Sequence, residues 1–91
     1  MKVRRLAIAW LRQEDWPRWL AMDPGFQPDY QHWLRRMDTT FERLKEAGVN
    51  AVKVEIRPDE FDEWRKATGR GVDTHARAAY AAFAAMRMDL H

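Results

Sequence analysis

The chain has no cysteine and no serine among its 91 residues. The absence of cysteine excludes disulfides, thiolate catalysis and cysteine-ligated zinc. It suits a reducing compartment, so we expect a cytoplasmic location. The absence of serine excludes hydrolysis by a serine nucleophile, and the threonines lie in no nucleophile motif.

Long apolar runs and a dominant charge are also missing. The run from Leu6 to Leu11 ends at Arg12, too soon for the core of a signal peptide. The alanine-rich stretch over residues 76–88 is broken by arginines and is too short to span a bilayer. The chain has sixteen basic and fourteen acidic residues, so its net charge is only +2. We therefore expect no membrane-crossing segment and no dedicated polyanion binding.

Two apolar runs predict strands. The first, residues 3–11, is apolar on both alternating faces from Leu6 onward, as in a strand covered on both sides. The second, residues 49–57, places Val52, Val54 and Ile56 on one face and charged residues on the other, so one of its faces should meet water.

Four amphipathic stretches predict helices. Two short ones follow the strands, with acidic residues in their first turns and aromatic residues behind them. The longest begins after Asp29 as its N-cap and ends at Gly48. Gly69 ends the third helix, and Asp73 or Thr74 caps the last, which ends near residue 90. Its apolar stripe includes Tyr80 and Phe83.

The segment beginning at Arg12 returns 45 positions later at Arg57, and both copies end in tryptophan, Trp16-Pro17-Arg18-Trp19 against Phe61-Asp62-Glu63-Trp64. The echo suggests a duplication with halves 3–47 and 49–90, although capping and burial alone favour the same residues. One α+β domain over residues 1–91 is predicted, in β-α-α-β-α-α order. A pseudo-twofold axis between the halves would make the two strands antiparallel, which we favour. A right-handed crossover, which would make them parallel, is the alternative.

The pattern of apolar residues predicts which side chains are interior and which surfaces a second copy would cover. We expect Val52, Val54 and Ile56, the stripe from Tyr30 to Leu44, and Tyr80 with Phe83 to be interior. A first strand apolar on both faces is hard to cover in so small a chain, and six of the eight residues from Ala78 to Ala85 are alanine, which leaves a smooth helix surface. A homodimer would cover both.

Candidate catalytic and metal sites are weak. The chain is tryptophan-rich, and all five tryptophans fall on expected apolar faces, which favours a structural role over ligand stacking. The histidines have no metal-ligand spacing. The carboxylate pairs Glu14/Asp15 and Asp59/Glu60 already serve helix starts. We expect no catalytic residue, no metal and no cofactor.

The junction over residues 69–73 is the remaining candidate. It joins two helices, and its exposed basic residues, Arg70, His75 and Arg77, are the predicted binding surface. We interpret the chain as a small non-enzymatic protein-binding or regulatory module, with a protein or a second copy as partner. The alternative is a nucleic-acid-binding protein using the helix-turn-helix-like segment 58–88, although acidic residues in its first helix disfavour phosphates.

Overall fold

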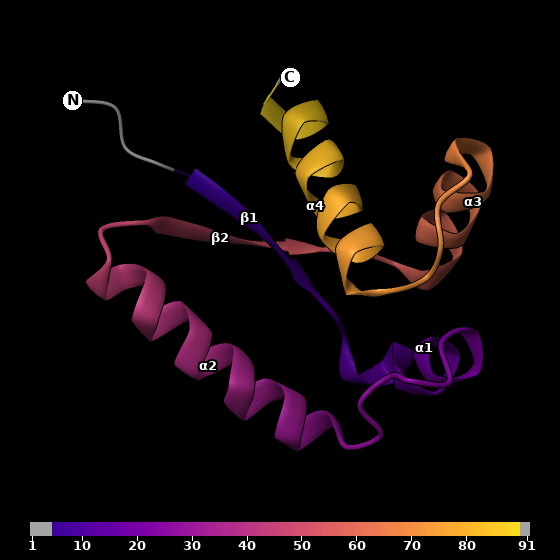
Figure 1. Ribbon diagram of the computed structural model, residues 1–91, viewed down its shortest axis with the longest axis horizontal. Helices are drawn as coiled ribbons and strands as arrows, with labels where there is room; N and C mark the ends of the chain where they lie inside the picture. Colours follow the sequence, from indigo (N-terminus) through magenta and orange to yellow (C-terminus); the bar gives the residue numbers. More distant parts are fainter. Residues whose placement is uncertain (1–4, 90–91) are drawn as a thin grey trace.

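The computed structural model describes residues 5–89, in which two strands and four α-helices follow the β-α-α-β-α-α order expected from the sequence (Figure 1). The elements are β1 (Arg5–Trp10), a short 3-10 helix η1 (Gln13–Asp15), α1 (Trp16–Met22), α2 (Tyr30–Glu46), β2 (Asn50–Glu55), α3 (Pro58–Thr68) and α4 (Thr74–Asp89). Val3, Leu90 and His91 lie outside the described residues.

The two strands run parallel, so the antiparallel arrangement favoured from the sequence is wrong. Residues 11–49 carry α1 and α2 and return the chain to the starting end of the sheet, which a parallel pair requires. Arg5 lies opposite Asn50 and Trp10 opposite Glu55, so the strand register equals the 45-position spacing of the sequence echo. The duplication itself stays a prediction.

The helices α2 and α4 cover opposite faces of the sheet (Figure 1). On one face the ring centroids of Trp10 and Trp33 of α2 are 5.1 Å apart, and Lys53 Nζ lies 4.0 Å from the centre of the Trp10 ring. On the other face the small side chains of Ala7 and Ala9 lie against the core, and α4 packs there mainly on β1. The alanine surface expected to serve a second copy is therefore partly used inside the chain.

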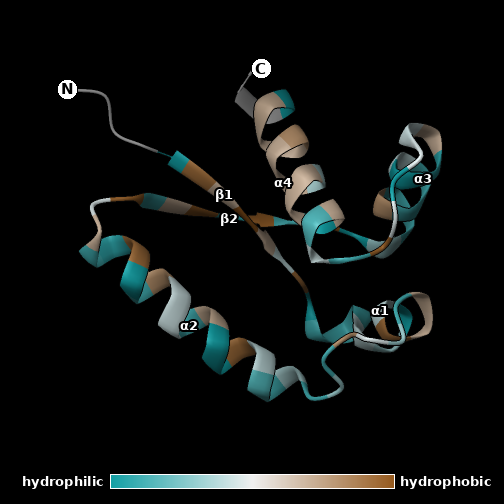
Figure 2. Cartoon of the chain, viewed as in Figure 1, coloured by the Kyte–Doolittle hydropathy of each residue, from teal (hydrophilic) through white to brown (hydrophobic). Residues whose placement is uncertain are grey.

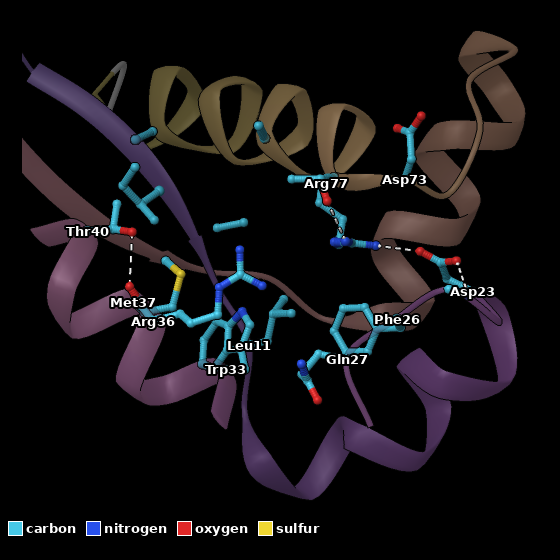
Figure 3. Close-up of a pocket in the computed structure, with 16 residues that line it drawn as sticks. Leu11, Asp23, Phe26, Gln27, Trp33, Arg36, Met37, Thr40, Asp73 and Arg77 are labelled. Carbon is cyan, nitrogen blue, oxygen red and sulfur yellow. Dashed lines mark hydrogen bonds and ion pairs between the residues drawn. The ribbon is translucent and has the colours of Figure 1, made fainter. Parts of the chain in front are cut away.

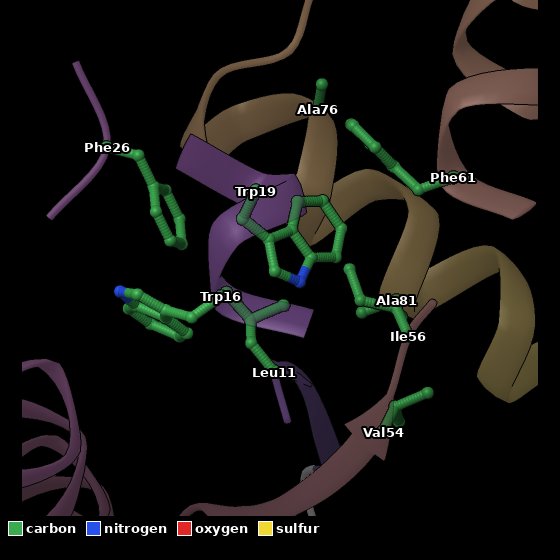
Figure 4. Close-up of a cluster of buried hydrophobic side chains, with 9 residues drawn as sticks. All are labelled: Leu11, Trp16, Trp19, Phe26, Val54, Ile56, Phe61, Ala76 and Ala81. Atoms are coloured by element: carbon green, nitrogen blue, oxygen red, sulfur yellow. The ribbon is translucent and has the colours of Figure 1, made fainter. Parts of the chain in front are cut away.

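The apolar core lies near the carboxyl ends of the strands, where α1, α3 and the first half of α4 meet (Figure 4). Trp19 and Phe61 are fully buried, with ring centroids 5.6 Å apart. The buried apolar residues are Leu11, Trp16, Trp19, Phe26, Val54, Ile56, Phe61, Ala76 and Ala81. The structural role expected of the tryptophans is met most fully by Trp16 and Trp19. In Figure 2 the most hydrophobic stretches include β1, whereas α4 is moderately hydrophobic over most of its length.

Burial at the amino end of the sheet is lower than expected. Val54 and Ile56 are buried as predicted, but Val52 is 40% exposed and Phe83 is 39% exposed. The prediction that these two residues are interior is wrong because α4 lies over β1 more than over β2, and the core gathers at the other end of the strands. Tyr80 and the apolar stripe of α2 are only half-buried.

The helix ends expected at Asp29, Gly69 and Asp73 are confirmed. Asp29 Oδ1 accepts a hydrogen bond from Gln31 N at 3.0 Å, and Asp73 Oδ1 accepts one from Ala76 N at 2.9 Å. Both side chains satisfy N–H groups that a helix start leaves without partners. Gly69 ends α3 with a φ of 72°, the left-handed conformation that glycine adopts without steric strain.

Candidate functional site

The outer edge of β1 faces away from its only strand neighbour in the described chain, β2. Ile56 N donates a hydrogen bond to Trp10 O at 3.1 Å, so the backbone of Trp10 faces β2. Backbone groups of successive residues in a parallel strand face opposite edges. The N–H and C=O groups of Ala7 and Ala9 therefore face the open edge.

A groove of about 600 Å³ runs along this edge (Figure 3). Ala7, Ile8 and Ala9 all line it. Because successive side chains of a strand point to opposite faces of a sheet, only a groove that lies along the edge can touch all three. Residues from α2 and α4, which cover opposite faces, form its two walls.

The walls differ in size and polarity. The α2 wall presents Trp33, Arg36, Met37 and Thr40. The α4 wall presents the small side chain of Ala78 and, at the start of the helix, Thr74 and Arg77. The loop between α1 and α2 closes one end of the groove with Phe26. The groove thus combines apolar surface with several polar side chains, a mixture that binding pockets also show.

Arg77 lies at the closed end of the groove and is 8% exposed, so the exposure expected from the sequence is wrong. Its Nη1 donates to Asp23 Oδ2 at 3.2 Å and to Val72 O at 2.7 Å, and its Nη2 donates to Thr74 Oγ1 at 3.0 Å. The guanidinium also lies 4.7 Å from the centre of the Phe26 ring. These contacts tie the start of α4 to the loop after α1.

Arg70 and His75 are exposed and do not line the groove. The Arg70 guanidinium lies 5.2 Å from the centre of the Trp64 ring, a cation–π contact on the surface of α3. The structure therefore does not bring Arg70, His75 and Arg77 together into one cluster. Binding of a partner by these residues stays a prediction.

Arg36 is the charged groove residue that the sequence reasoning missed. It is exposed on α2, its side chain reaches into the groove (Figure 3), and it makes no ion pair with any residue from 5 to 89. Its neighbour Arg35 is also exposed but does not line the groove. Two adjacent arginines on a helix look alike in the sequence, and only the position of β1 distinguishes them.

Several acidic residues at the carboxyl ends of the strands form ion pairs. Arg12 donates to both carboxylate oxygens of the buried Asp15, at 2.8 and 2.9 Å, and this hydrogen bonding raises the pKa of Arg12 above its ordinary value. Glu55 pairs with Arg12 at 3.3 Å and with Arg57 at 3.6 Å. Asp59 pairs with Arg18, which links α3 to α1. Arg12 and Arg57, which occupy equivalent positions in the sequence echo, thus both pair with the carboxylate of Glu55.

Across residues 5–89, no three histidine or carboxylate side chains gather closely enough to hold a metal ion. None of the helices described has the length and apolarity needed to cross a membrane.

Comparison with known proteins gives no match, whether the chain is compared with protein-family models, with curated proteins or with solved structures. The groove and the open strand edge are therefore the features from which a function is inferred.

Proposed function

We propose that the chain is a small non-enzymatic protein-binding module that takes an extended segment of a partner protein as an added strand beside β1. The observation that carries this proposal is the edge of Ala7 and Ala9, whose backbone N–H and C=O groups face a groove of about 600 Å³. An open strand edge is a template for pairing with another chain. Strand addition is a recurring mode of peptide recognition, in which main-chain hydrogen bonds supply affinity and side-chain pockets supply specificity.

The two walls suit the alternating side chains of such a strand. Its side chains would point alternately toward Trp33 and Met37 on α2 and toward Ala78 on α4. The small Ala78 leaves room for a large side chain, and the aromatic ring of Trp33 offers an apolar contact. The segment would thus bury apolar surface on both sides while its backbone pairs with β1.

The β1 strand of a second copy of this chain fits the open edge less well than an isolated extended segment does, because the second copy also brings its own helix. The helix α4 packs mainly on β1, so a directly opposed second β1 would bring its own α4 within about one strand spacing, ~4.8 Å. Packed helices keep their axes about 8–10 Å apart. The homodimer predicted from the sequence would need another surface, and the exposed Phe83 and Met86 on α4 are candidates.

Nucleic-acid binding by the segment 58–88 receives less support. Asp59 and Glu60 are exposed on the first turn of α3, where they would repel phosphates, and Arg77 is held by Asp23. We therefore place protein binding first.

The test starts from a displayed library of random eight-residue peptides, selected on the folded protein. Binding of the enriched peptides is then measured on Ala9→Pro, which removes an N–H from the open edge but no bond between β1 and β2. We expect this variant to fold and to bind at least tenfold more weakly, because a net hydrogen bond of about 1 kcal/mol is lost and the proline ring obstructs the added strand.

Lys53→Pro is the matched control. The backbone of Lys53 faces the outer edge of β2, away from the groove, so this variant should bind like the unmodified protein. If no peptide is enriched, or if folded Ala9→Pro binds as tightly as Lys53→Pro does, strand addition at β1 is wrong.

A further inference from the structure

Of the charged side chains that line the groove, one cation has no ion pair with any residue from 5 to 89. Four charged residues line the groove: Asp23, Arg36, Asp73 and Arg77. Asp23 and Arg77 form an ion pair at 3.2 Å, and Asp73 accepts the hydrogen bond of Ala76 N at the start of α4. Among the residues that the structure describes, Arg36 alone of the four has neither an ion pair nor a side-chain hydrogen bond.

The surroundings of Arg36 favour a carboxylate as its partner. The side chain extends from α2 into the groove near Trp33 and Met37, and Figure 3 shows its guanidinium between the two walls. A segment filling the groove would exclude water from this guanidinium and strengthen its interaction with an anion. The planar guanidinium donates two parallel hydrogen bonds to a carboxylate, the geometry in which arginine binds most specifically.

We infer that the partner segment carries an aspartate or glutamate side chain opposite Arg36 and an apolar side chain two positions away, against Trp33. This inference rests on the proposed strand addition. Trp33 and Arg36 are three residues apart, ~4.5 Å along α2. Alternate side chains of a strand are ~6.6 Å apart, so one strand can meet both residues.

The small α4 wall completes the recognition pattern. The side chain between the acidic and the apolar positions points toward Ala78. Arg77, the charged residue of α4 that lines the groove, is engaged with Asp23. The position that faces Ala78 should therefore be apolar or neutral.

The experiment repeats the peptide selection on three proteins, with every peptide embedded between neutral flanks so that no terminal carboxylate lies near the groove. The unmodified protein should enrich aspartate or glutamate at one position. Arg36→Glu should enrich lysine or arginine at that same position, and Arg35→Glu, the matched control outside the groove, should select like the unmodified protein. Replacing the selected glutamate by glutamine should weaken binding to the unmodified protein about fivefold and leave binding to Arg36→Gln unchanged.

The outcomes separate this inference from the proposed function. If the selected peptides bind at the β1 edge but show no preference for an acidic residue, the inference of an acidic side chain opposite Arg36 is wrong, while strand addition remains supported. An acidic preference that persists in Arg36→Glu would also overturn this inference, because another cation would then be responsible. Enrichment of no peptide by the unmodified protein rejects strand addition itself, and the acidic segment with it.

Discussion

Arg77 is a buried cation that holds two parts of the chain together. Its contacts with Asp23, Val72 and Thr74 satisfy most of the guanidinium's hydrogen-bond donors. A buried charge keeps its place only when it is paired and hydrogen-bonded, and Asp23 meets that condition here. Arg77 is thus part of the fold that shapes the groove.

Replacing Arg77 by alanine should lower the free energy of unfolding by about 2–3 kcal/mol, because it leaves the half-buried Asp23 without its partner. Arg70→Ala is the matched surface change and should alter stability by less than about 0.5 kcal/mol. Urea unfolding of the two variants decides the matter, and equal losses would show that the Arg77 contacts do not stabilise the protein.

Trp16 and Trp19 are both buried but differ in their polar atoms. Trp16 Nε1 donates to Gln27 O at 2.9 Å, whereas Trp19 Nε1 is buried without a hydrogen-bond partner among the described residues. Replacing Trp16 by phenylalanine removes a donor that is hydrogen-bonded, whereas replacing Trp19 by phenylalanine removes a donor that is not. The loss of side-chain volume is the same in both. We expect Trp19→Phe to be about 1–2 kcal/mol less destabilising than Trp16→Phe in guanidinium unfolding. The reverse order would contradict this assignment.

At the scale of the elements, the ends of the helices depend on single residues, which is why the sequence predicts them well. Asp29, Asp73 and Gly69 act locally, through hydrogen bonds or backbone freedom that need no tertiary partner. The direction of the strands depends instead on how α1 and α2 pack across the sheet. No single residue of β1 or β2 determines how these helices pack. Local sequence patterns therefore fit both parallel and antiparallel strands, and the antiparallel arrangement that we favoured is wrong.

The junction between α3 and α4 offers a matched pair of glycines. Gly69 has a φ of 72°, and a Cβ there would meet no atom within 4 Å, so only backbone strain opposes a side chain. Gly69→Ala should destabilise the protein by about 1 kcal/mol, and Gly71→Ala, which has no positive φ, should be neutral or slightly stabilising. Thermal unfolding of both variants provides the measurement. An equal effect of the two changes would contradict the left-handed helix end at Gly69.

At the scale of the whole molecule, the groove could not be predicted from the sequence because it requires three separate parts of the chain. Ala7 and Ala9 look like ordinary residues of a buried strand, and Arg36 looks like a solvated helix residue. They become a site only when α2 and α4 cover opposite faces of a sheet that ends at β1. The junction favoured from the sequence was chosen for local features, and its Arg77 belongs to the groove only as a structural end wall.

Self-association is a separate prediction at this scale. The exposed apolar side chains Leu6, Val52, Phe83 and Met86 are the ones a second copy would cover. We expect light scattering at micromolar concentration to give twice the 10.9 kDa mass of one chain. The variant Phe83→Glu with Met86→Glu should return the protein to a monomer. A monomer in the unmodified protein would reject the homodimer without affecting the groove.

The central claim is that the edge of β1 is open and receives an added strand, and amide hydrogen exchange of β1 tests it most directly. In the free protein, the amides of Ala7 and Ala9 should exchange at least tenfold faster than those of Ile8 and Trp10, which face β2. Adding a selected peptide should slow Ala7 and Ala9 and leave Ile8 and Trp10 nearly unchanged. Protected Ala7 and Ala9 amides in the free protein, or fast exchange that persists when the peptide is bound, would contradict the account.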